Sequence, residues 1–342
     1  MPLRPRIDQG VSIPEISVVV PVFNEAGNVG PLCERLVPVL ERVAASWEVV
    51  FVDDGSEDGT LAAIRARNLA DPRIGAVSFS RNFGKEIAIA AGLDHARGRA
   101  VVIMDADLQH PPEAIETFVA RWREGYVMVY GERTSRADES PVKRGFARLF
   151  YRLFDRFGET RLPAGAGDFR LIDAKGVAVL RGLPERARFS KGLYAWIGFR
   201  SVGVPFTVAE RESGVSKWSF RKLFRFAFDG ITAFSTVPLR VWTWLGGVIS
   251  LFSIAAAVYF FVRTLLFGPD VAGYPSLIVS IMFLGGVQLL SLGILGEYIG
   301  RIFAEVKRRP LYVVAERVGG VEDVAHPPPP GLVRDERRAA RL

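Results

Sequence analysis

Cysteine is nearly absent from this chain, since Cys33 is the single one among 342 residues. One cysteine excludes an intrachain disulfide, and no cysteine-based metal site is evident. Residues 1–14 are polar and proline-rich and lack the apolar stretch of a secretory signal. No nucleic-acid-binding motif is present. These absences fit a catalytic part in the cytoplasm and leave membrane targeting to later segments.

The chain instead combines many apolar residues with many charged ones. Hydrophobic residues make up 49% and charged residues 24%, and the mean hydropathy is +0.20. This mixture indicates a soluble part joined to a membrane part. The net charge is +7, and the basic residues concentrate between Arg133 and Arg225 and beside the hydrophobic segments. Anionic lipid headgroups and phosphorylated substrates are therefore favoured as partners over nucleic acid.

Short apolar runs alternate with helical patterns through the first half of the chain. We expect strands at residues 16–20, 49–52, 74–79, 100–104 and 127–130, and later ones at 169–172 and 202–208. We expect helices at residues 29–44, 60–69, 85–96, 112–124 and 142–158. This alternation predicts an α/β domain with a mostly parallel sheet and flanking helices, with ligands bound outside the carboxyl ends of the strands.

Acidic and amide side chains follow three of the expected strands. These residues are Asn24, Glu25, Asp53, Asp54, Asp105 and Asp107. The carboxyl ends of parallel strands lie at one edge of a sheet, so the three groups should line one site.

The segment Asp105-Ala-Asp107-Leu-Gln109 is the strongest candidate for a metal site. Two neighbouring carboxylates suit Mg²⁺ or Mn²⁺, which completes its shell with waters and substrate phosphates. The spacing also matches the start of an EF-hand loop, but His110 replaces the required glycine and a strand precedes the loop. A solvated pair of carboxylates without a metal is the other alternative. We expect a divalent-metal site.

Three further acidic residues are candidates for the site, and two of them have a second interpretation. Asp53 and Asp54 suit contacts with a ribose or a base, although Asp54 could instead cap the following helix. NAD binding is not expected, because no Gly-x-Gly-x-x-Gly follows the first strand. Asp168 stands in a glycine-flanked turn and is either a turn residue or an active-site base or orienting group.

Basic residues after the sheet strands could neutralise a diphosphate. Arg133, Arg144, Arg211 and Lys217 are the candidates, since arginine suits bidentate phosphate contacts and lysine supplies a compact charge. Phenylalanines recur at helical spacing over residues 219–234, with basic residues opposite. We expect a basic amphipathic helix in the membrane interface there, with an ordinary surface helix as the alternative.

Two later segments, 241–262 and 276–299, are each long enough to span a membrane, because about 20 apolar residues cross the hydrocarbon core. Basic residues crowd the outer flanks of both segments. By the positive-inside rule, both termini are then cytoplasmic. The tail from residue 321 is expected to be disordered.

Seven motifs together resemble the family 2 glycosyltransferases of the GT-A fold. They are Val-Pro-Val-Phe-Asn-Glu25, Val-Asp-Asp-Gly-Ser56, Ser80-Arg-Asn-Phe-Gly-Lys85, Met-Asp-Ala-Asp-Leu-Gln109, Gly-Asp-Phe-Arg170, Ser216-Lys217 and Leu295-Gly-Glu-Tyr-Ile-Gly-Arg301. Within that family the chain is most similar to the polyisoprenyl-phosphate glycosyltransferases, and among these to the bactoprenol (undecaprenyl-phosphate) glucosyltransferases. His110 departs from the family, which usually has aspartate there. The polymerase motif Gln-x-x-Arg-Trp of related processive synthases is absent.

The resemblance implies a role for each matching residue. Pro21, Phe23, Glu25, Asp53, Asp105, Arg211 and Lys217 would bind the nucleotide sugar. Asp105, Asp107 and Gln109 would hold Mg²⁺ or Mn²⁺, and Asp168 and Asp107 would be catalytic. Arg133, Arg144, Ser216 and Lys217 would bind the lipid phosphate.

The resemblance also implies a domain plan. We expect a flexible extension at 1–14, a GT-A domain at 15–218, an interfacial helix at 219–238, two transmembrane helices within 239–300, a cytoplasmic segment at 301–320 and a disordered tail at 321–342. It further implies an inner-membrane, multi-pass homo-oligomer, with a tetramer as one form.

The expected reaction is inverting transfer of a sugar from a nucleotide donor to undecaprenyl or another polyprenyl phosphate at the cytoplasmic face. UDP-glucose is the preferred donor. UDP-aminoarabinose, UDP-galactose, UDP-N-acetylhexosamine and GDP-mannose remain alternatives, as does a non-catalytic membrane scaffold that binds nucleotide sugars.

Overall fold

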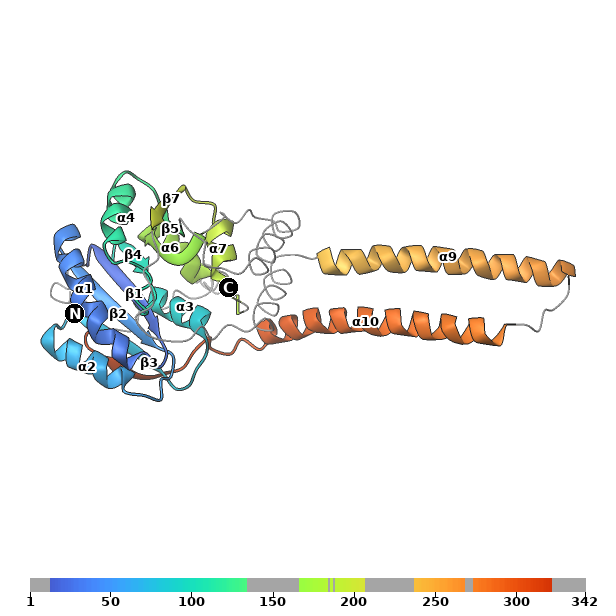
Figure 1. Ribbon diagram of the computed structural model, residues 1–342, viewed down its shortest axis with the longest axis horizontal. Helices are drawn as coiled ribbons and strands as arrows, with labels where there is room; N and C mark the ends of the chain where they lie inside the picture. Colours follow the sequence, from blue (N-terminus) through green and yellow to red (C-terminus); the bar gives the residue numbers. More distant parts are fainter. Residues whose placement is uncertain are drawn as a thin grey trace, which may run out of the picture. The chain divides into compact units, whose positions relative to one another are not determined.

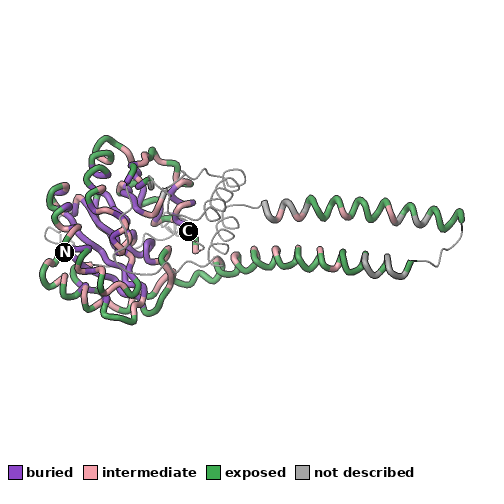
Figure 2. Tube along the Cα trace, viewed as in Figure 1, coloured by how far each residue is buried: buried purple, intermediate pink, exposed green. Residues whose placement is uncertain are grey.

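The structure is a computed structural model that describes residues 13–133, 166–183, 185, 186, 188–206, 237–267 and 273–321. These residues divide into two compact units. The first unit contains the described residues up to 206 and those after 309, and the second contains those from 237 to 309. The first unit buries its apolar residues, whereas the second exposes them (Figure 2).

Eight strands of the first unit form one sheet in the order β7-β5-β6-β4-β1-β2-β3-β8 (Figure 1). Their bounds are β1 Ile16–Val22, β2 Trp47–Asp53, β3 Ile74–Phe79, β4 Ala100–Ile103, β5 Met128–Arg133, β6 Ala166–Asp173, β7 Ser201–Phe206 and β8 Val314–Val318. Strands β3, β2, β1 and β4 are parallel, and β5 is parallel to β7. Strand β6 runs antiparallel between β4 and β5, and β8 runs antiparallel to β3. The predicted α/β class with a mostly parallel sheet is confirmed.

Helices cover both faces of the sheet because its central strands are apolar on both sides. Every residue of β2 is buried. Helices α1 (Ala26–Val43), α2 (Thr60–Ala70) and α4 (Ala114–Arg123) pack on one face, and α3 (Lys85–His95) and α6 (Ala174–Gly182) pack on the other (Figure 1). Gly92 lets α3 approach β1 closely, because a Cβ there would collide with the side chain of Val19.

The alternating half of the chain is predicted well. The strand expected at 74–79 has the predicted bounds, and the other described strands and helices expected before residue 134 end within a few residues of their predicted ends. Helices α6 and α7 (Ser190–Trp196) and strand β8 were not predicted. The helix expected at 142–158 lies outside the described residues.

Strand β8 lies in the segment 301–320, for which no strand was predicted, and it joins the sheet. The Ser80 amide donates a hydrogen bond to the Val313 carbonyl over 3.0 Å. The Tyr312 ring stacks on Phe79 with 5.0 Å between centroids, and its hydroxyl lies 3.1 Å from an Asp94 carboxylate oxygen. The chain that follows the second unit is therefore attached beside the end of β3.

The second unit contains two long helices, α9 (Val237–Phe267) and α10 (Tyr274–Val306). Large apolar side chains are exposed along both, including Trp244 and Phe252 on α9 and Met282 on α10. Within the described residues, Ser280–Val306 is the one stretch long and apolar enough to cross a membrane, and α9 contains a shorter apolar stretch at Trp244–Ala256. An interfacial helix is expected at 219–238, and residues 219–236 of it lie outside the described residues.

Candidate active site

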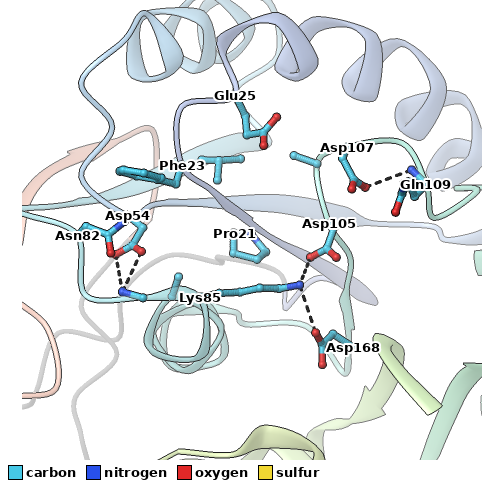
Figure 3. Close-up of a pocket in the computed structure, with 14 residues that line it drawn as sticks. Pro21, Phe23, Glu25, Asp54, Asn82, Lys85, Asp105, Asp107, Gln109 and Asp168 are labelled. Atoms are coloured by element: carbon cyan, nitrogen blue, oxygen red, sulfur yellow. Dashed lines mark hydrogen bonds and ion pairs between the residues drawn. The ribbon is translucent and has the colours of Figure 1, made fainter. Parts of the chain in front are cut away.

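A pocket of about 490 Å³ opens at the carboxyl ends of β1 and β4 (Figure 3). It brings together seven of the predicted site residues, namely Pro21, Phe23, Glu25, Asp105, Asp107, Gln109 and Asp168. Arg144, Arg211, Ser216 and Lys217 lie outside the described residues. Arg133 is the last residue of β5, and the structure describes its backbone but not its side chain.

The loop after β4 is held in a constrained shape. Leu108 has a positive φ of 58°, although its side chain is buried. This left-handed backbone is unfavourable for leucine and typical of functional loops. The Gln109 amide donates to an Asp107 carboxylate oxygen over 3.2 Å, which folds the loop back on itself. The Asp105 and Asp107 side chains both reach the pocket as a result.

His110 stabilises the same loop. The Asp105 amide donates a hydrogen bond to His110 Nδ1 over 3.2 Å, so this nitrogen is an acceptor in the structure. The imidazole is buried and stacks on Phe169, with 4.8 Å between ring centroids. Phe169 directly follows Asp168 on β6. His110 therefore links the loop of Asp105 to the strand that carries Asp168.

Lys85 is the cation of this pocket. It is the first residue of α3, and its Nζ atom lies 2.6 Å from Asp105 Oδ1 and 3.2 Å from Asp168 Oδ2 (Figure 3). Burial by itself would lower the pKa of Lys85, but the two carboxylates outweigh burial and raise it. The two carboxylates therefore favour the charged form of the ammonium.

Asp168 is a buried anion. Burial acts to raise its pKa, but Lys85, Lys191 and Arg170 outweigh burial and hold the pKa well below its usual range. Its Oδ1 atom is buried and has no hydrogen-bond partner among the described residues. A buried carboxylate oxygen without a partner is costly, so this atom is available to a ligand.

A layer of buried polar groups supports Asp168. Glu86 accepts hydrogen bonds from the Ser190 amide, over 3.0 Å, and from the Ser190 hydroxyl. Burial and the nearby Asp168 raise the pKa of Glu86. Arg170 is buried, and its guanidinium carbon lies 3.7 Å from the centre of the Tyr194 ring. These contacts fix the floor of the pocket from α3, α7 and β6.

The carboxylates of Asp53 and Asp54, at the end of β2, accept hydrogen bonds from other residues of the protein. Asp53 accepts hydrogen bonds from the Ser56 amide over 3.0 Å and the Ser78 hydroxyl over 2.7 Å. Asp54 accepts from the Phe83 and Gly84 amides over 2.6 and 2.9 Å. Asp54 lines the pocket, whereas Asp53 is 1% exposed and is not among the lining residues. The nucleotide contact of Asp53 stays a prediction.

The residues of the pocket fit a hard divalent cation. Asp105, Asp107 and Gln109 present oxygen atoms, and the unpartnered Asp168 Oδ1 adds a buried negative charge. No group of three or more His, Cys, Asp or Glu side chains in the described part of the chain is placed to hold a metal. Mg²⁺ does not require such a cage, because one or two carboxylates with substrate phosphates suffice.

Lys85 and Glu86 were not predicted as site residues. A signal for Lys85 was available, because it ends the Ser80-Arg-Asn-Phe-Gly-Lys85 motif and follows the carboxyl end of β3. Single lysines are usually solvated, so the sequence alone does not distinguish this one.

Similarity to known proteins extends over most of the chain. The protein family "Glycosyl transferase family 2" matches residues 17–180, and the family "GtrB C-terminal hairpin" matches residues 237–302. An uncharacterized glycosyltransferase of Synechocystis sp. is 49% identical over 305 residues, which cover 89% of this chain and 96% of that protein. A bactoprenol glucosyl transferase of Shigella phage SfII is 44% identical over 308 residues, which cover 88% of this chain and 97% of that protein.

Among solved structures, a mannosyltransferase from Pyrobaculum calidifontis in complex with GDP-Man and Mn²⁺ covers 88% of this chain and 89% of its own. It has 19% sequence identity and a TM-score of 0.46.

Proposed function

We propose that this chain, which belongs to glycosyl transferase family 2, transfers glucose from UDP-glucose to undecaprenyl phosphate or another polyprenyl phosphate. The observation that carries the proposal is the pocket, where Asp105, Asp107 and Asp168 present carboxylates beside the Lys85 ammonium. Such a pocket suits a sugar diphosphate together with a divalent cation. The similarity to bactoprenol glucosyl transferases spans both the sheet and the two long helices and supports the choice of acceptor.

In the proposed reaction, an oxygen of the lipid phosphate forms a bond to the anomeric carbon of the sugar. The bond between that carbon and the diphosphate oxygen breaks, UDP leaves, and the anomeric configuration inverts. Mg²⁺ or Mn²⁺ held by Asp105, Asp107 and Gln109 would supply positive charge to the leaving diphosphate. Pro21, Phe23 and Glu25 line the same pocket and would contact the nucleotide, and Asp53 is proposed as a further nucleotide contact.

Asp168 acts in this proposal by orienting groups and stabilising the developing positive charge on the sugar. A phosphate monoester has a second pKa of about 6, so the acceptor is already mostly ionised at neutral pH. The lowered pKa of Asp168 makes it a weak base, which supports a role other than proton removal.

The acceptor's long hydrocarbon tail places the reaction at a membrane. Withdrawing such a tail from a bilayer costs about 0.8 kcal/mol per CH₂ group, so the enzyme has to meet the phosphate at the interface. We propose that segments 241–262 and 276–299 both span the membrane, that residues 219–238 lie in the interface and that both termini are cytoplasmic. In this arrangement Arg133, Arg144, Ser216 and Lys217 bind the lipid phosphate, Arg211 and Lys217 contact the donor, and the protein is a homo-oligomer.

The proposal is tested with the purified full chain in detergent or in lipid nanodiscs. The protein is incubated with undecaprenyl phosphate and, in separate reactions, UDP-glucose, UDP-galactose, UDP-N-acetylglucosamine, UDP-aminoarabinose and GDP-mannose. Mass spectrometry then identifies the glycolipid. We expect a hexosyl-phosphate lipid with UDP-glucose and none with the Asp105→Ala variant. Product from a different donor alone would correct the sugar, and no product from any donor would overturn the proposal.

A further inference from the structure

The Lys85 ammonium lies where two carboxylates of different kinds meet. Asp105 is about one quarter exposed and is a proposed metal ligand, whereas Asp168 is more deeply buried. Figure 3 shows the lysine side chain extending across the floor of the pocket, with its nitrogen between the two acids. Lys85 therefore neutralises both the deeply buried Asp168 and Asp105, the proposed metal ligand.

A divalent cation bound to Asp105 would share its carboxylate with this ammonium. Lys85 Nζ lies 2.6 Å from Asp105 Oδ1, and a metal bound to that oxygen would stand within a few ångströms of a like charge. Repulsion at such a distance is substantial in a partly buried pocket. Lys85 Nζ also lies 3.2 Å from Asp168. The ammonium would therefore keep one carboxylate partner if it withdrew from Asp105.

We propose that Lys85 is a resident counter-cation which divalent metal has to displace from Asp105, so that metal binds well only together with the donor diphosphate. The inference rests on the metal-dependent function proposed above. The negative charges of the diphosphate offset the repulsion between metal and ammonium, and the displaced ammonium remains paired with Asp168. Lys85 thereby couples metal binding to donor binding and keeps the pocket neutralised between catalytic cycles.

The test measures Mn²⁺ binding to the full chain in detergent, with and without UDP, by the electron paramagnetic resonance signal of free Mn²⁺. In Lys85→Met, which removes the charge and keeps the length, we expect Mn²⁺ without UDP to bind about fivefold more tightly or better. We expect Mn²⁺ affinity in the presence of UDP to stay as in the wild type, so the gain in Mn²⁺ affinity on adding UDP should shrink by the same factor. By linkage, the gain in UDP affinity on adding Mn²⁺ should shrink equally. Lys85→Arg keeps the charge and should bind Mn²⁺ as the wild type does.

Lys191→Met is the matched control for general electrostatics. Lys191 also lowers the pKa of Asp168, but among the described residues the lysine paired with Asp105 is Lys85. Its loss should change Mn²⁺ affinity by less than about twofold, because Coulomb repulsion weakens with distance and Lys191 forms no ion pair with the proposed metal ligand Asp105. An equal effect in Lys191→Met and Lys85→Met would overturn the displacement mechanism.

Two results separate the failure of this inference from the failure of the proposed function. Unchanged or weaker Mn²⁺ binding by folded Lys85→Met, with normal binding by the wild type plus UDP, would overturn the inference alone. No Mn²⁺ binding by the wild type plus UDP would overturn both. If circular dichroism shows that Lys85→Met does not fold, Lys85→Gln is measured in its place with the same expected tightening.

Discussion

Two acidic groups stand at the same edge of the sheet and are used in opposite ways. The closed pair, Asp53 and Asp54, is occupied by hydrogen bonds from Ser56, Ser78 and the amides that follow β3. The open set, Asp105, Asp107 and Asp168, lines the pocket and includes a buried oxygen without a partner among the described residues.

The difference shows that residue type and strand position do not decide the role of a carboxylate. The closed pair ties the loop after β2 to the loop that precedes Lys85, so its charge is used to hold the backbone. In the open set, Lys85 pairs with Asp105 and Asp168, and Asp168 Oδ1 has no hydrogen-bond partner among the described residues, so we expect this set to receive a ligand. The predictions below act on one group or the other, from the largest expected effect to the smallest.

Asp105→Ala should abolish most of the activity without unfolding the protein. It removes an oxygen that faces the pocket and the partner of Lys85, and losses of one electrostatic contact in an active site are typically about 10²- to 10³-fold in kcat. Glycolipid formation and the unfolding temperature are measured on the same preparation. A variant that retains more than about one tenth of wild-type activity would show that Asp105 does not hold the reacting charge.

Asp168→Asn should lose activity by a factor of about 100 or more, and raising the pH should not restore it. The carboxyl has a lowered pKa, so it is ionised throughout the range from about pH 5 to 9 and contributes no limb to the rate profile there. Its stabilising contribution is present above the ordinary aspartate pKa of about 4 and is lost only as the pH falls towards the lowered value. Full recovery of Asp168→Asn at alkaline pH would instead indicate a general base.

Asp54→Ala should act mainly on stability. It leaves the Phe83 and Gly84 amides without their acceptor, and a lost hydrogen bond to a buried charged group costs about 1–3 kcal/mol of unfolding free energy. Denaturant unfolding measures this loss. Because the amides precede Lys85, we also expect some loss of kcat, smaller than that of Asp105→Ala. Unchanged stability with abolished activity would place Asp54 in the open set.

Ser78→Ala should have the smallest effect of the four. It removes one donor to Asp53 but leaves the Ser56 amide in place, so the unfolding free energy should fall by about 1 kcal/mol. Activity at saturating donor should stay within about twofold of wild type, and a larger loss would show that the hydrogen bond of Ser78 sets the nucleotide contact predicted for Asp53.

The parallel half of the fold is predictable because its information is local. Strands β1 to β4 are short apolar runs, and the helices between them show helical spacing, so each element is visible in its own residues. The predicted family and fold class are confirmed by the family 2 match and the sheet order. Since the parallel strands β1 and β4 end at one edge, six predicted site residues meet in one pocket, and Asp168 joins them from the beginning of the antiparallel strand β6.

The remaining features depend on contacts between distant parts of the chain. Strand β8 is five residues long and alternates in burial, and its place is set by pairing with β3. The buried Asp53 accepts a hydrogen bond from Ser78 on the neighbouring strand. The role of Lys85 depends on β4 and β6 bringing Asp105 and Asp168 to either side of it. None of these pairings can be predicted from the local sequence.

The most direct test of the distinction between the open and closed groups is anomalous X-ray scattering from Mn²⁺ in crystals of the full chain grown with UDP. We predict a single strong peak within about 2.5 Å of oxygen atoms of Asp105 and Asp107, with the Lys85 ammonium withdrawn from Asp105 and still paired with Asp168. A peak on the Asp53–Asp54 pair, or a Lys85 that keeps its contact with Asp105 beside the bound metal, would contradict the account.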